Sequence, residues 1–79
     1  MPVVFRRDGF RFFFYSNEGD PREPIHIHVR RGDGDAKFWV SPVALESSDG
    51  FDARTLRELA RMVEENAPRI ERAWHEHFG

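Results

Sequence analysis

The sequence predicts an α+β domain: a small antiparallel sheet of about four strands, arranged as two hairpins, followed by two C-terminal helices packed on one face. Two observations predict this ββββαα order. The first half of the chain alternates apolar and polar residues, which is the strand period, and the second half carries apolar residues at helical spacing. A length of 79 residues allows one modest core. We therefore expect residues 1–79 to form a single domain.

The first hairpin is predicted by Asp8-Gly9, which separates two aromatic-rich runs over residues 3–7 and 10–15. A two-residue loop at this point places one apolar set on a single face, where a helix is expected to cover it. The expected opposing pairs are Arg7 with Phe10, Phe5 with Phe12, and Val3 with Phe14. The mixed face then carries Val4, Arg6, Arg11, Phe13 and Tyr15.

Residues 16–24 read as a loop, and a second hairpin follows it. Residues 25–30 alternate without a break, so His26, His28 and Arg30 share the face opposite the apolar residues of the strand. Residues 31–35 form the turn. Residues 36–40 form the fourth strand, with Lys37 and Trp39 on the polar side. After Ser41-Pro42, residues 43–45 are expected to add only a short edge strand.

Two helices are predicted after residue 51. Asp52 is a suitable N-cap, and Phe51 and Leu56 have the spacing of a hydrophobic staple. Asn66 is expected to cap a second helix with Pro68 in its first turn. The predicted buried stripes are Leu56, Leu59, Ala60 and Val63 in the first helix, and Ile70, Ala73, Trp74 and Phe78 in the second.

Composition excludes several classes of function. The chain has no cysteine, which removes disulfides, thiolate nucleophiles and cysteine-based zinc sites, and which fits a reducing cytoplasm. No apolar run reaches membrane length, so no membrane partner is expected. The formal net charge of −2 provides no global attraction to nucleic acid, so any such binding requires a local basic patch.

Five segments, in order along nearly the whole chain, resemble the bacterial domain-of-unknown-function family 4160: PVVF at 2–5, GFRFFFYSN at 9–17, PIHIHV at 24–29, AKFW at 36–39 and WHEHFG at 74–79. The resemblance implies a small prokaryotic cytoplasmic protein. It also implies a gene that often lies beside a second small gene, in a pair proposed to be a toxin–antitoxin-like module. The family has no settled activity, so the resemblance assigns no catalytic residue.

The polar row of the third strand, His26, His28 and Arg30, is the candidate site. Two imidazoles at this spacing can reach one metal ion if a further ligand comes from residues 75–77. A lone His-x-His is a weak metal signal, and we expect neither a metal nor another cofactor. Since the apolar residues of the strand must face the core, we expect all three members of the row to be accessible to solvent.

Two functions remain open. We expect a binding component of a two-gene regulatory or toxin–antitoxin-like module, working as a homo-oligomer or with the product of a neighbouring small gene, and with RNA or DNA as a further candidate partner. The alternative is a metal-independent ribonuclease or phosphodiesterase in which His26, His28 and Arg30 act on phosphate. In this alternative Arg30, with Arg11 or Lys37, would hold phosphate, and Tyr15 and Trp39 would stack on bases. In the first reading Arg11, Tyr15, Lys37 and Trp39 belong to a basic and aromatic face that binds the partner.

Overall fold

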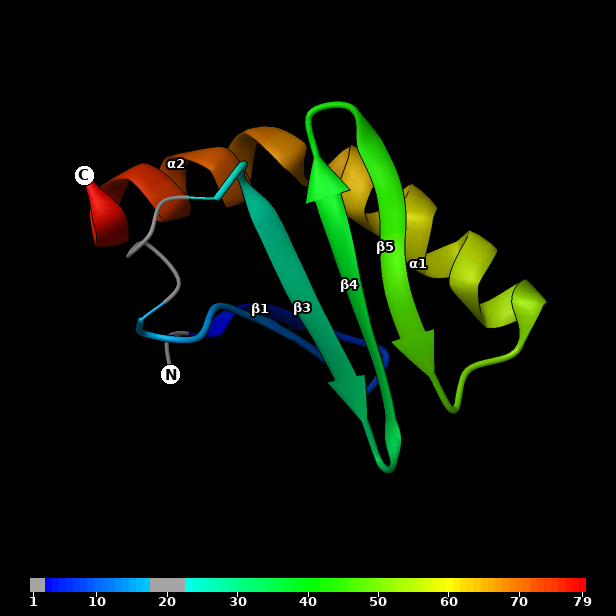
Figure 1. Cartoon of the computed structure of the whole chain (residues 1–79). Coiled ribbons are helices and arrows are strands. Elements are labelled where there is room, and N and C mark those ends of the chain that lie inside the picture. Colours follow the sequence, from blue (N-terminus) through cyan, green and yellow to red (C-terminus); the bar gives the residue numbers. More distant parts are fainter. Residues whose placement is uncertain (1–2, 18–22) are drawn as a thin grey trace.

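The computed structural model describes residues 3–17 and 23–79 and confirms the α+β class. A five-stranded antiparallel sheet has the strand order β1-β2-β3-β4-β5, and two helices follow it (Figure 1). The elements are β1 (Val3–Arg7), β2 (Phe10–Phe13), β3 (His26–Arg31), β4 (Gly34–Val40), β5 (Val43–Asp49), α1 (Ala53–Glu65) and α2 (Ala67–Phe78). Within the described ranges, neither helix has the length and apolar character needed to cross a membrane.

The β1–β2 hairpin turns at Asp8 and Gly9, whose φ angles are 52° and 81°. Both residues therefore adopt the positive φ that a two-residue hairpin loop requires. The predicted pairs of Arg7 with Phe10 and Phe5 with Phe12 are confirmed. The predicted pair of Val3 with Phe14 is wrong, because a register irregularity between Val3 and Phe5 places Val3 opposite Phe13. β2 accordingly ends at Phe13, earlier than expected.

The fifth strand is longer than the sequence suggested. We expected only residues 43–45 to continue the sheet, but β5 runs from Val43 to Asp49 and pairs with β4 from Val40 back to Asp35. Six of its seven residues are exposed, so this edge strand lacks the apolar alternation that marks a strand in sequence. The predicted loop over residues 16–24 lies partly outside the described residues.

The two helices begin at the positions that the sequence predicts. The Asp52 carboxylate accepts a hydrogen bond of 2.8 Å from the backbone N–H of Thr55, which makes it the N-cap of α1. Asn66 alone separates α1 from α2, as expected. Its side chain does not cap α2; Nδ2 instead donates a 2.8 Å hydrogen bond to the Met62 carbonyl in the last turns of α1.

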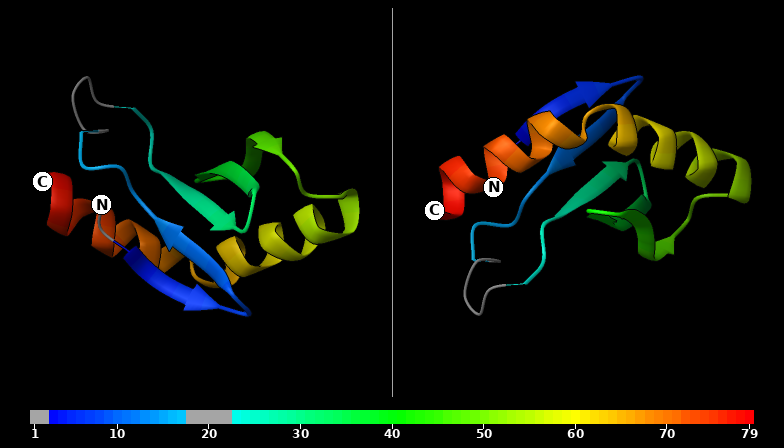
Figure 2. Two further views of the ribbon diagram at one scale, coloured as in Figure 1. Left: turned by 90° about the horizontal axis from the view of Figure 1, so that it is seen from below. Right: turned by 90° about the horizontal axis from the view of Figure 1, so that it is seen from above.

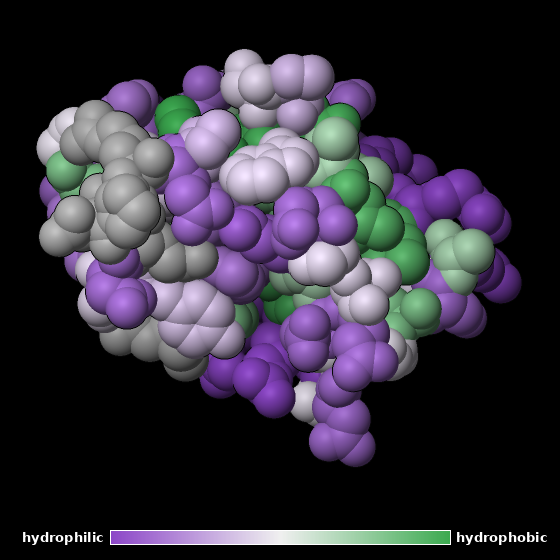
Figure 3. All heavy atoms as spheres, viewed as in Figure 1, coloured by the Kyte–Doolittle hydropathy of each residue, from purple (hydrophilic) through white to green (hydrophobic). Residues whose placement is uncertain are grey.

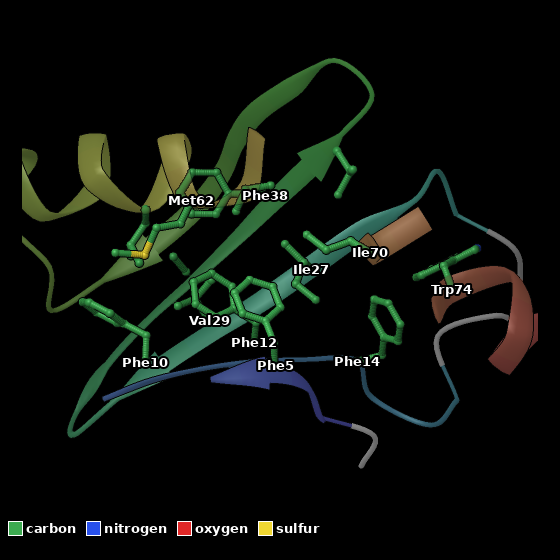
Figure 4. Packing of buried hydrophobic residues seen from close by; sticks show 14 residues of the cluster. Phe5, Phe10, Phe12, Phe14, Ile27, Val29, Phe38, Met62, Ile70 and Trp74 are labelled. Atoms are coloured by element: carbon green, nitrogen blue, oxygen red, sulfur yellow. The ribbon is translucent and has the colours of Figure 1, made fainter. Parts of the chain in front are cut away.

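Both helices lie on the same side of the sheet (Figure 2), and the core fills the space between the helices and the sheet. Phe5 and Phe12 stack there with ring centroids 4.2 Å apart and an interplanar angle of 9°. Ile70 and Trp74 of α2 close the core near the end of β2, as the predicted stripe requires (Figure 4). No described helix covers the opposite side of the sheet, which we call the outer face.

Candidate functional site

The register of the sheet aligns three cations directly across the outer face. Arg6 is the Cα partner of Arg11, and Arg11 is the partner of Arg30. We call these three residues the arginine row. The line continues into Asp35 on β4 and Asp49 on β5, so the positive part of this line is confined to β1, β2 and β3.

The next line across the same face contains His28. Its cross-strand partners are Phe13 and Lys37, and Lys37 in turn faces Ser47. The imidazole stacks on Phe13 with centroids 5.6 Å apart and meets the Tyr15 ring at 4.6 Å. His28 is half-buried, whereas Tyr15 is 40% exposed.

A hollow of about 240 Å³ lies beside His28, and we call it the His28 hollow. The His28 hollow is lined by Phe13, Tyr15, His28, Val29, Arg30, Asp35, Ala36, Lys37 and Ser47. The structure therefore brings together four of the seven residues that the sequence singled out. The space-filling view from this side shows hydrophilic and neutral side chains over most of the face, with hydrophobic ones gathered toward β5 (Figure 3).

The prediction that all three members of the polar row are accessible to solvent is wrong for His26. Arg30 is exposed and His28 is half-buried, but His26 is 0% exposed. Its ring lies 5.0 Å from the Trp74 ring of α2 and 5.7 Å from that of Trp39, and Nδ1 is 3.0 Å from the Pro24 carbonyl oxygen. Because His26 is the first residue of β3, it lies at the end of the sheet, where α2 reaches it.

Lys37 and Trp39 lie together on β4, with the Lys37 ammonium 4.8 Å from the Trp39 ring centroid. The ammonium also forms a 3.1 Å ion pair with Glu23. A paired ammonium has less electrostatic attraction to offer a ligand than the arginine row does. Trp39 is only half-buried, so part of its ring surface remains available for stacking.

Metal ligands do not converge in the described part of the chain. Within residues 3–17 and 23–79, no three His, Asp or Glu side chains gather as a cation site would require. His75 and His77 lie exposed on α2 and do not join His26 and His28 in such a group.

Arg6 belongs to this face, although the sequence did not single it out as a site residue. The Asp8-Gly9 turn already placed Arg6 and Arg11 on one face of the hairpin. The signal was therefore present, but its meaning depends on Arg30 lying opposite Arg11 on β3. That pairing joins residues 19 positions apart, across a connection whose length does not fix the register.

Comparison with known protein families identifies the family of this chain. The family model described as a domain of unknown function (DUF4160) matches residues 9–75, which is most of the chain. No curated protein and no solved structure matches the sequence.

Proposed function

The chain belongs to the DUF4160 family, as its sequence predicted, and on the basis of its outer face we propose that it is a binding protein that holds single-stranded nucleic acid across β1, β2 and β3. The observation that carries the proposal is the arginine row beside the His28 hollow, with Arg30 shared by both. No described helix shields this face, so an extended ligand has access to it.

The chemistry of the two parts is complementary. Guanidinium groups match the geometry of phosphate oxygens and bind them through paired hydrogen bonds. Exposed aromatic rings stack on bases without regard to the base sequence. Tyr15, which is exposed and lies beside His28, is the ring that would stack here. On the same face, Asp35 of β4 and Asp49 of β5 repel phosphate, which favours a path over β1 to β3.

The phosphodiesterase alternative is less well supported. A mechanism with two histidines needs both imidazoles in reach of the substrate, since one accepts and the other donates a proton. His26 is buried against Trp74 and Trp39. His28 alone remains beside the hollow, so burial favours a binding function over catalysis.

The proposal is tested by fluorescence anisotropy with labelled single-stranded RNA and DNA oligonucleotides that carry 5′-hydroxyl ends. We expect Arg30→Gln to weaken binding about tenfold, because it removes a cation from the centre of the face. Arg61→Gln is the matched control: it removes the same charge from an exposed position on α1, the helix on the other side of the sheet. No binding by the wild-type protein, or equal losses in both variants, would contradict the proposal.

A second prediction is that the protein binds the product of a neighbouring small gene. A cytoplasmic location for this complex is also still a prediction. The observation that favours a partner is the open edge at β5, where Leu45 is 45% exposed and where, among the described residues, no further strand pairs with the outward backbone groups. Light scattering of the purified protein, with and without the neighbouring gene product, checks it. A stable monomer in both samples would contradict a partner at this edge.

A further inference from the structure

A second hollow, of about 210 Å³, lies where the β1–β2 and β3–β4 turns meet at one end of the sheet. We call it the arginine pocket, because all of the arginine row and one further arginine line it. Its residues are Arg6, Gly9, Arg11, Arg30, Arg31 and Gly32. No acidic residue is among them, and none of its arginines forms an ion pair with an acid in the described part of the chain.

The pocket concentrates positive charge at a cost to the fold. Cross-strand neighbours of like charge destabilise a sheet, and the arginine row contains two such pairs in succession. The chain as a whole is slightly acidic, with a net charge of −2, so this clustering is local rather than a consequence of composition. An anion bound between the guanidinium groups would turn the repulsion into attraction.

Arg11 carries a donor that the described fold leaves unpaired. Its Nε atom is buried and has no hydrogen-bond partner in the described structure. Buried donors are paired in the great majority of cases, because an unpaired one loses its hydration without replacement. The guanidinium carbon lies 5.3 Å from the Phe13 ring centroid, which keeps the side chain over the outer face. An anionic oxygen bound in the pocket would provide an acceptor for this donor.

Arg31 is held in place before any ligand binds. Its guanidinium lies 3.9 Å from the Phe10 ring centroid and donates a 3.2 Å hydrogen bond to the Asp8 carbonyl. Gly9 leaves room for the stem, since a Cβ there would lie only 3.3 Å from Cδ of Arg31. A fixed guanidinium loses little conformational entropy on binding, which favours affinity.

We propose that the arginine pocket binds a phosphomonoester dianion, namely the terminal phosphate of a strand that lies on the outer face. A terminal phosphate carries up to two negative charges and three strong acceptor oxygens, which suits several guanidinium groups better than an internal phosphodiester does. The pocket lies at the end of the sheet and shares Arg30 with the His28 hollow, so a strand whose bases occupy that hollow can place its terminal phosphate in the pocket. The inference rests on the proposed function for the source of the phosphate.

The test compares three versions of one labelled single-stranded oligonucleotide: 5′-phosphate, 3′-phosphate and hydroxyl at both ends. We expect one phosphorylated version to bind at least tenfold tighter than the hydroxyl version. Arg6→Gln should bring that ratio close to one, because Arg6 lines the arginine pocket and not the His28 hollow. Lys37→Gln is the matched control and should keep the ratio, because Lys37 lines only the His28 hollow.

A second measurement separates the two proposals. Inorganic phosphate, titrated while the amide resonances of Gly9 and Gly32 are followed, should shift both in the wild-type protein and neither in Arg6→Gln. Equal affinity for all three oligonucleotides, with no response to phosphate, would overturn the pocket while leaving the proposed function intact. A response to phosphate without binding of any oligonucleotide would support the pocket and overturn the proposed function.

Discussion

Salt dependence tests whether the arginine row is the part of the outer face that meets phosphate. The three side chains of the row are the cations to count there, because Lys37 is already paired with Glu23. Arg31 is not counted, since it is engaged with Asp8 and Phe10 at the end of the sheet. Each phosphate that a protein neutralises on a single strand releases counterions and adds about −0.7 to the slope of log K against log salt.

Three contacts therefore predict a slope of about −2 for an oligonucleotide with hydroxyl ends. Between 50 and 200 mM salt, the affinity should fall roughly 16-fold. Arg30→Gln leaves two contacts, so its slope should be about −1.4 and its loss roughly sevenfold over the same range. Arg61→Gln, on α1, should keep the wild-type slope.

The assay is anisotropy of one labelled oligonucleotide, titrated at five or more salt concentrations. A slope near zero in the wild-type protein would mean that phosphate contacts do not drive binding. A slope that is unchanged in Arg30→Gln would mean that the contacts lie elsewhere on the protein. Either result would refute the assignment of the row.

Three further predictions concern stability. Phe12→Ala removes a fully buried ring and should cost about 3–5 kcal/mol out of the roughly 4–12 kcal/mol expected for a domain of this size, which urea unfolding would measure. Hydrogen bonds from Thr55 hold the pKa of Asp52 below its usual range. The ionised Asp52 therefore contributes its full stabilisation above about pH 4, and this contribution is lost as the pH falls through the lowered native pKa. The thermal midpoint of Asp52→Asn should accordingly depend less on pH between 6 and 3 than that of the wild type. Gly34→Ala forces a Cβ into the Phe51 ring and should cost about 1–3 kcal/mol, whereas Gly32→Asn, in open space at φ +58°, should cost less than about 1 kcal/mol; thermal unfolding of both variants checks the contrast.

The sequence predicted those parts of the fold that local rules determine. The Asp8-Gly9 turn fixed the pairing of Phe5 with Phe12, because a two-residue loop leaves no freedom of register. The N-cap at Asp52 followed from the same kind of short-range chemistry. Alternation assigned Lys37 and Arg30 to the outer face correctly, since the period of a strand is 2 wherever one face is buried.

What the sequence could not predict depends on contacts between distant segments. His26 is buried because Trp74, 48 positions later, packs against the end of β3. No local pattern contains that contact. The length of β5 was missed because an edge strand with exposed residues is stabilised by pairing with β4 rather than by burial of its own side chains. The arginine row required the register between β2 and β3, which the connection between them does not specify.

Only Asn66 separates α1 from α2, so the number of residues in this junction determines which face α2 turns toward the sheet. Each residue of a helix turns its successors by about 100°, so one inserted residue at this point would swing Ile70 and Trp74 away from the sheet. The same rotation would uncover His26, because Trp74 is part of its cover. Insertion or deletion at Asn66 would therefore alter both the core and the surroundings of His26 at once.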